Sequence, residues 1–126
     1  ASIRAYSPAT VIAEKFQAMV VLGRANSRMK DFYDIWALSK SQPFGDELAR
    51  AIRATFDRRK TVIPITPPDC LTPEFAADQT KQQQWISFAA NVASKPTSLT
   101  EVVVDLATFL MPHARMAQSI EATTRL

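Results

Sequence analysis

The sequence has few of the residues on which most enzymatic and metal sites depend. It contains one cysteine, one histidine and two glycines among 126 residues. The lone Cys70 excludes an internal disulfide, and Cys70 with His113 cannot supply the side chains of a structural zinc site. Gly23 and Gly45 are too few and too isolated for a glycine-rich phosphate loop. No catalytic triad can be assembled around His113, which we expect at the surface near a helix end.

Long hydrophobic runs are also missing. No apolar stretch approaches the roughly 20 residues that span a bilayer, so we expect no membrane partner. The first residues lack a basic segment followed by a continuous apolar stretch, the pattern of a secretory signal, and we therefore expect a cytoplasmic protein. Hydrophobic residues make up 47% and charged residues 21%, as is usual for a soluble globular protein. The net charge of +3 permits contacts with phosphates without demonstrating them.

Hydrophobic periodicity and capping residues predict an all-α fold, a compact bundle of about five helices. A Ser-Pro start and Gly23 bound the first predicted helix, at about 8–22. Asp46 is the expected cap of the third helix. The brief alternation at 2–6 is compatible with a short N-terminal strand, and 114–126 can be helical or frayed. The remaining helices are expected at about 29–39, 46–59, 78–93 and from 98 or 100 to Pro112.

A proline-rich connection separates the third predicted helix from the rest. Four prolines fall within 61–73, which excludes a central strand there and indicates an extended surface segment. We expect a single helical domain over 1–126. The alternative is a subdivision into 1–60 and 72–126 across this connection.

Lys15 is the most informative residue of the chain. At about 100° per residue, the apolar side chains of 11–22 fall on both sides of Lys15, while Glu14 and Gln17 face away. A buried, unpaired ammonium is strongly disfavoured. Lys15 must therefore reach water, pair with a carboxylate or bind an anionic ligand. These physical arguments leave a structural ion pair and a functional contact both open, and the structural one is the commoner.

Two carboxylates three residues apart follow in Lys30-Asp31-Phe32-Tyr33-Asp34-Ile35-Trp36. Asp31 lies near the start of the second predicted helix, where capping explains a carboxylate as well as catalysis does. Asp34 lies one turn further in, where capping is no longer available, so it is the stronger functional candidate. Either carboxylate could meet Lys15 in the groove between the first two helices.

Basic residues form two groups around these segments. Arg24, Arg28 and Lys30 lie near the expected groove and are the candidates for holding a phosphate. The second group belongs to the third helix and its end: Arg50, Arg53, Arg58, Arg59 and Lys60. Such a stretch is typical of a solvated helix face, and the alternative is non-specific binding of RNA.

Two segments together resemble a known family. They are Thr10-Val11-Ile12-Ala13-Glu14-Lys15-Phe16-Gln17-Ala18 and Arg28-Met29-Lys30-Asp31-Phe32-Tyr33-Asp34-Ile35-Trp36. Their order and spacing are similar to those in the C-terminal half of AbiEii/AbiGii-type nucleotidyltransferases, toxins of type IV toxin-antitoxin and abortive-infection systems. In that family a helix with an A-E-K-x-x-A core precedes a K/R-D-x-x-D helix. The specific likeness covers about residues 6–38.

The resemblance implies a domain like the C-terminal domain of a polymerase-β-like nucleotidyltransferase. It implies that Lys15 contacts the triphosphate of an NTP, and that Asp34, with Asp31 nearby, orients Lys15 or accepts the proton of the attacking hydroxyl. A nucleotidyl group would then pass to an RNA or protein hydroxyl. Some family members modify tRNA acceptor ends, so RNA, including tRNA, and an antitoxin protein are the implied macromolecular partners.

The family's magnesium-binding Asp-x-Asp pair does not occur in this sequence. We therefore expect no metal site in this chain, and Mg²⁺ with NTP only alongside an N-terminal catalytic half that the sequence lacks. The chain alone is expected to be inactive. The alternative is a catalytically inactive helical module that binds a protein partner or RNA.

Overall fold

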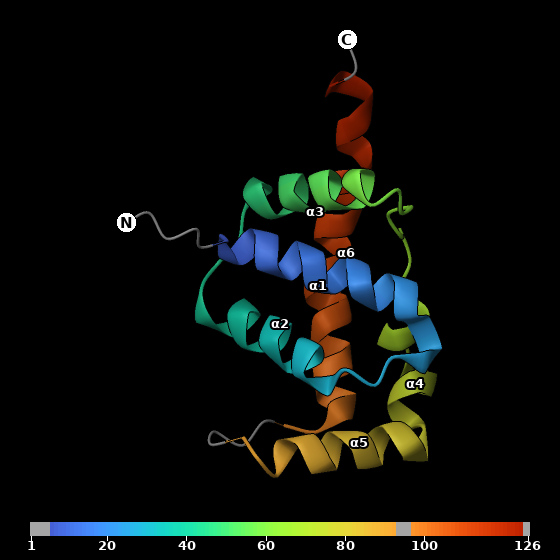
Figure 1. Ribbon diagram of the computed structural model, residues 1–126. Coiled ribbons are helices and arrows are strands. Elements are labelled where there is room, and N and C mark those ends of the chain that lie inside the picture. Colours follow the sequence, from blue (N-terminus) through green and yellow to red (C-terminus); the bar gives the residue numbers. More distant parts are fainter. Residues whose placement is uncertain (1–5, 93–96, 125–126) are drawn as a thin grey trace.

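The computed structural model describes residues 6–92 and 97–124, with side chains up to residue 120 (Figure 1). Over these residues the chain forms six α-helices, two short 3-10 helices and no strand, which confirms the predicted all-α class. The strand predicted at 2–6 lies outside the described residues, except for Tyr6, which belongs to no regular element. The helices are α1 (Pro8–Leu22), η1 (Gly23–Ala25), α2 (Met29–Ser41), α3 (Asp46–Arg58), η2 (Asp69–Leu71), α4 (Pro73–Ala77), α5 (Gln79–Ala89) and α6 (Leu99–Thr124).

Helix α1 begins and ends where its local sequence predicts. The Ser7 side chain accepts a hydrogen bond from the Thr10 backbone N–H at 3.1 Å, and Pro8 occupies the first helical position. Gly23 ends the helix with φ at +55°, a backbone conformation that glycine adopts at little cost. The N-cap, proline and glycine signals therefore fix both ends of the helix that carries Lys15.

Helices α2 and α3 differ from the predictions only at their ends. Helix α2 continues to Ser41, two residues past its expected end. Asp46 is the first residue of α3 rather than its cap, and Gly45 occupies the cap position. The Gly45 N–H donates to Glu47 Oε1 at 3.0 Å, so the second residue of the helix supplies the capping carboxylate.

Helix α6 does not end at Pro112 but runs on to Thr124 with this proline inside it, so the helical alternative for 114–126 holds as far as Thr124. Pro112 is exposed, and beyond it Ala114 and Ala117 are completely buried. A proline in a helix interior costs one backbone hydrogen bond and introduces steric strain. Continued packing of the apolar stripe offsets this cost, so tertiary contacts override the local helix-breaking signal.

Helix α5 is shorter than predicted and ends at Ala89. Trp85 is its one buried side chain, and the indole N–H donates to the Thr97 carbonyl at 2.9 Å. The backbone N–H groups of Asn91 and Val92 bond to carbonyls three residues earlier, which tightens the chain into a turn. With so little packing on one face, α5 has little to stabilise further helical turns. The predicted stop at 95–96 lies outside the described residues.

Helix α6 is the long element on which α2, α3 and α4 pack. Figure 1 shows it running lengthwise behind α1, α2 and α3, and α2, α3 and α4 all contact it. Phe16 of α1 meets Phe56 of α3 with ring centroids 5.5 Å apart. Phe32 of α2 stacks on Phe75 of α4 at 5.6 Å. The hydrophobic core therefore includes side chains from both sides of the proline-rich connection.

The segment between α3 and α4 is extended up to η2, as its prolines predict. The Arg115 guanidinium of α6 donates to the Ile65 carbonyl at 3.1 Å and ties the segment to the bundle. Among the described helices, none combines the length and apolar character needed to cross a membrane.

Candidate functional site

Lys15 projects from α1 toward α2 and lies between two carboxylates. Its Nζ atom is 2.9 Å from Asp31 Oδ1 and 3.2 Å from Asp34 Oδ2. The Lys15 side chain is 26% exposed, against 7% for Asp31 and 22% for Asp34. The structure thus brings all three proposed catalytic residues together, and the ammonium contacts both carboxylates instead of one.

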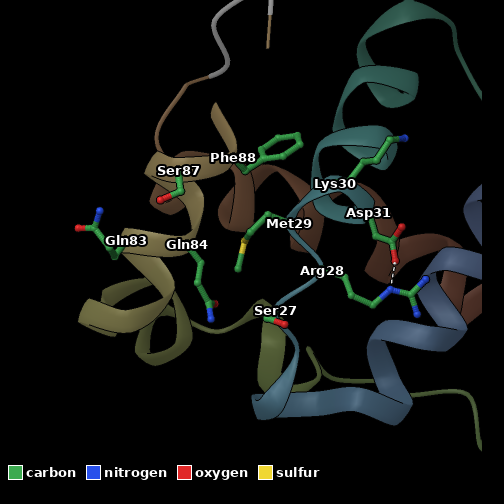
Figure 2. A pocket seen from close by; sticks show the side chains of 9 residues that line it. All are labelled: Ser27, Arg28, Met29, Lys30, Asp31, Gln83, Gln84, Ser87 and Phe88. Atoms are coloured by element: carbon green, nitrogen blue, oxygen red, sulfur yellow. Dashed lines mark ion pairs between the residues drawn. The ribbon is translucent and has the colours of Figure 1, made fainter. Parts of the chain in front are cut away.

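Two further cations extend this group into what we call the Lys15 cluster, formed by Lys15, Arg28, Lys30, Asp31 and Asp34. Arg28 Nε lies 3.1 Å from Asp31 Oδ2, a pair drawn as a dashed line in Figure 2. Lys30 Nζ lies 2.8 Å from Asp34 Oδ2. Three cations face two carboxylates, so the cluster carries a formal charge of +1. It is therefore a net cationic surface with fixed internal pairing.

The connection before α2 positions these side chains. Asn26 is buried, its Oδ1 accepts from the Arg28 backbone N–H at 2.8 Å, and its carbonyl accepts from Lys81 Nζ at 2.8 Å. These bonds hold the chain as it enters the helix. Asp31 and Asp34 then lie one turn apart on the same face of α2. The sequence spacing and this anchored turn together direct both carboxylates at Lys15.

The electrostatics keep Lys15 charged. Burial lowers the pKa of Lys15, but the hydrogen bonds and negative charges of Asp31 and Asp34 together raise it more, so the pKa lies above its ordinary value. A lysine in this state is a poor base and a poor nucleophile at neutral pH. The arrangement suits a permanent point charge that meets an anion.

Lys15 lies at a surface hollow of about 380 Å³ beside α1, which we call the α1 hollow. Its lining residues are Tyr6, Val11, Glu14, Lys15, Ala18, Arg28, Asp31 and Arg59. Arg59 was not among the predicted phosphate-binding residues. It follows α3, and neither its spacing from Lys15 in the sequence nor any local motif indicates that the two residues line the same hollow.

A second hollow, the α2–α5 hollow, measures about 710 Å³ and is shown in Figure 2. It is lined by Ser27, Arg28, Met29, Lys30, Asp31, Gln83, Gln84, Ser87 and Phe88. Figure 2 shows Gln84 and Phe88 of α5 beside Met29, with Gln83 and Ser87 pointing away from it. Arg28 and Asp31 line both hollows, so their ion pair forms a common boundary. The α5 residues were not predicted, because only the tertiary fold places α5 beside α2.

Arg24 is the one proposed phosphate-binding residue outside this arrangement. It lies in η1, beyond the end of α1, and α1 rises about 10 Å between Lys15 and Leu22. It lines neither hollow. The structure therefore joins Arg28 and Lys30 to the Lys15 cluster and leaves Arg24 apart from it.

The basic group around α3 is not one uniform solvated stripe. Arg53 Nε pairs with Asp57 Oδ2 at 2.9 Å within the helix. Arg58 Nη2 reaches Glu14 Oε2 of α1 at 3.3 Å. These charges are largely committed to neighbouring carboxylates, which weakens the case for a continuous RNA-binding track along α3.

The chain's lone cysteine and histidine line neither hollow. Cys70 is buried, and burial raises the pKa of its thiol to about 12, so it is protonated at neutral pH. His113 lies within α6 rather than at a surface helix end, half-buried with its ring 5.4 Å from that of Phe109. Within the described part of the chain, no three His, Cys, Asp or Glu residues group as metal ligands.

Comparison with known protein families gives a match that spans this site. The family described as "Nucleotidyl transferase AbiEii toxin, Type IV TA system" matches residues 1–111. The chain belongs to this family. The match includes the whole Lys15 cluster and both hollows. No curated protein and no solved structure matches the chain.

Membership of the AbiEii family confirms the resemblance carried by the paired segments around Lys15 and Asp31. It relates the chain to the nucleotidyltransferase toxins of type IV toxin-antitoxin systems. The likeness to the C-terminal domain of polymerase-β-like enzymes stays a prediction, as do the individual roles of the site residues.

Proposed function

We propose that the Lys15 cluster binds the phosphates of a nucleoside triphosphate and serves nucleotidyl transfer, in which an RNA or protein hydroxyl attacks the α-phosphorus and pyrophosphate leaves. One observation carries the proposal: the Lys15 ammonium is held between Asp31 and Asp34 at the edge of a hollow that Arg28 also lines. Family membership supports the type of chemistry. The geometry supports the choice of residues.

A cation that is already in position favours the binding of a phosphate. The two carboxylates fix the position of the ammonium before a ligand arrives, so little side-chain entropy is lost on binding. The surplus positive charge of the cluster favours an anion, and the partial burial of Lys15 strengthens each charge interaction relative to bulk water. Arg28 and Lys30 add guanidinium and ammonium donors at the same edge.

The two aspartates have different parts in the proposal. Asp31 uses both carboxylate oxygens, one toward Lys15 and one toward Arg28, and is the more buried of the two. It is therefore the positioning residue. Both ion pairs of Asp34 use Oδ2, so Oδ1 is the oxygen that can face the hydroxyl of an acceptor. Asp34 lines neither hollow, so we assign the acceptor to neither of them.

Magnesium does not fit the cluster as it stands. Three of the four carboxylate oxygens are engaged by cations, and the net positive charge of the cluster opposes a further cation. We propose that the ligands of any Mg²⁺ come from a separate catalytic half, and we assign no step of this chain to the metal. Because the family is that of a type IV toxin-antitoxin system, the expected protein partner is an antitoxin.

Calorimetric titration of the 126-residue chain with ATP, GTP, CTP and UTP tests the proposal. Lys15→Met should weaken binding of the preferred nucleotide by about tenfold, or about 1.4 kcal/mol. Lys40→Met is the matched control, because Lys40 Nζ also pairs with an aspartate, Asp105, at 3.3 Å but lines neither hollow. Its affinity should stay within about twofold of wild type.

Equal losses in the two variants would contradict a specific role for Lys15. Absence of binding by every nucleotide would overturn the proposal for this chain. That result would favour the alternative of an inactive helical module in which the cluster is a structural ion-pair network.

A further inference from the structure

Arg59 approaches the α1 hollow from a part of the chain far from the Lys15 cluster. It directly follows α3, and its Nη1 donates to Gln17 Oε1 of α1 at 3.0 Å. Its Nη2 lies 3.9 Å from Glu14 Oε2, at the outer limit of an ion pair. The side chain is 42% exposed. One edge of the guanidinium is therefore fixed to α1 while much of the group still faces solvent.

Gln17 holds Arg59 in place. It is 7% exposed, and a buried amide is costly unless its polar atoms are bonded. Its Oε1 accepts from Arg59, and its Nε2 donates to Thr61 Oγ1 at 2.9 Å. The Thr61 hydroxyl in turn donates to the Arg59 carbonyl at 3.0 Å. This closed set of bonds fixes both the backbone and the side chain of Arg59 over the outer face of α1.

Arg58 leaves Arg59 available for a ligand. Arg58 Nη2 is 3.3 Å from Glu14 Oε2, closer than Arg59 at 3.9 Å to the same oxygen. Glu14 is thus neutralised mainly by Arg58, which does not line the α1 hollow. A fixed guanidinium with only a weak carboxylate contact retains donors for an incoming anion.

We propose that Arg59 is a phosphate-contact residue of the α1 hollow, the third cation of that site beside Lys15 and Arg28. The inference rests on the proposed function for its ligand class, a polyphosphate such as that of an NTP. Lys15 and Arg28 reach the hollow from α1 and the start of α2, and Arg59 reaches it from the end of α3. Cations from three parts of the fold therefore line the same hollow, which suits a ligand with several phosphates.

Titration of the 126-residue chain with inorganic tripolyphosphate at low salt tests this inference. Arg59→Gln should weaken binding by about tenfold. Arg59→Lys retains the charge without the planar fork, and its affinity should lie between those of wild type and Arg59→Gln. The control is Arg50→Gln, which removes the same charge. Arg50 is an exposed residue of α3 that lines neither hollow. This variant should stay within about twofold of wild type at equal ionic strength.

Lys15→Met in the same titration separates this inference from the function on which it rests. If Lys15→Met loses binding while Arg59→Gln matches Arg50→Gln, the proposed site stands and the role of Arg59 is refuted. If Arg59→Gln loses binding while Lys15→Met does not, Arg59 contacts the anion and the Lys15 assignment fails. Failure of the wild-type chain to bind tripolyphosphate overturns both.

Discussion

Lys15 Nζ and Asp31 Oδ1 lie 2.9 Å apart although their residues are 16 positions apart in the sequence. The contact joins the middle of α1 to the first turn of α2 and closes the helical hairpin through Gly23 and the anchored turn at Asn26. The location of this ion pair explains how it can both stabilise the fold and contribute to binding. The carboxylate is turned inward and the ammonium reaches the edge of a hollow, so the pair fixes the helices and presents a cation.

The two aspartates should differ in their contribution to stability. Asp31 is 7% exposed and pairs with two cations through two oxygens, whereas Asp34 is 22% exposed. Asp31→Asn should lower the free energy of unfolding by about 1–3 kcal/mol, the range for hydrogen bonds to buried charged groups. Asp34→Asn should cost about 1 kcal/mol or less, because its pairs are more exposed to solvent. Urea denaturation at pH 7 measures both, and a larger loss for Asp34→Asn would refute this ordering.

The raised pKa of Lys15 makes a prediction for alkaline pH. In the folded protein the pKa lies above its ordinary value of 10.5. The charged form is thus favoured by folding, and its contribution to stability is fully present below pH 10.5 and declines as the pH rises through the folded pKa. The difference in unfolding free energy between wild type and Lys15→Met should be constant from pH 8 to about 10. Above that pH, the wild type should lose stability relative to the variant.

Urea titrations of both proteins from pH 8 to 11.5 provide the measurement. Subtracting the variant removes any effect of pH that the two proteins share. A difference that stays flat over the whole range would show that Asp31 and Asp34 do not stabilise the charged ammonium.

Local signals were sufficient to predict much of the fold and the centre of the site. Ser7, Pro8 and Gly23 fix α1 through backbone chemistry within a few residues, so their effect can be read without the tertiary structure. Lys15 and its carboxylates were also foreseeable, because a lysine among apolar positions needs an opposite charge and the adjacent segment offers two. That both aspartates pair with Lys15 could be known only from the way α1 and α2 cross in the structure.

Contacts that depend on distant elements were not foreseeable. Gln17 was expected to face away from the apolar surface of α1, but the end of α3 covers it and leaves it buried. Its partner Arg59 is 42 residues away, and no period or motif relates the two positions. The residues of α5 that line the second hollow were missed for the same reason. Helical periodicity describes one helix and carries no information on which helix will pack against it.

Replacing Lys60 with glycine should stabilise the protein. It has φ at +52°, the left-handed conformation that costs an L side chain energy, just after α3. The Thr61 N–H bonds to the Phe56 carbonyl at 2.9 Å and the Lys60 N–H to the Asp57 carbonyl at 3.1 Å, the pattern of a helix C-terminus that normally has glycine at this position. Lys60→Gly should raise the free energy of unfolding by about 0.5–1 kcal/mol.

Ala54→Gly is the control for this change. Ala54 is an exposed residue within α3, where glycine should lower stability by about 1 kcal/mol. Thermal and urea denaturation of the two variants should therefore move in opposite directions. A loss of stability in Lys60→Gly would mean that the lysine side chain contributes more than its backbone conformation costs.

Pro112→Ala should stabilise the protein, because Pro112 lies inside α6 with its side chain exposed. Proline cannot donate a backbone hydrogen bond to the carbonyl one turn earlier, that of Thr108, and alanine can. The gain should be about 1–2 kcal/mol, less than the full cost of proline in a helix because the proline-containing unfolded chain is already restricted. The control is Thr108→Ala, which alters an exposed residue one turn away. It should change the free energy of unfolding by no more than about 0.7 kcal/mol, since it alters helix propensity alone. Equilibrium urea unfolding decides the matter: a neutral or destabilising Pro112→Ala would show that the buried stripe from Leu110 to Ala117 packs only on a helix bent by the proline.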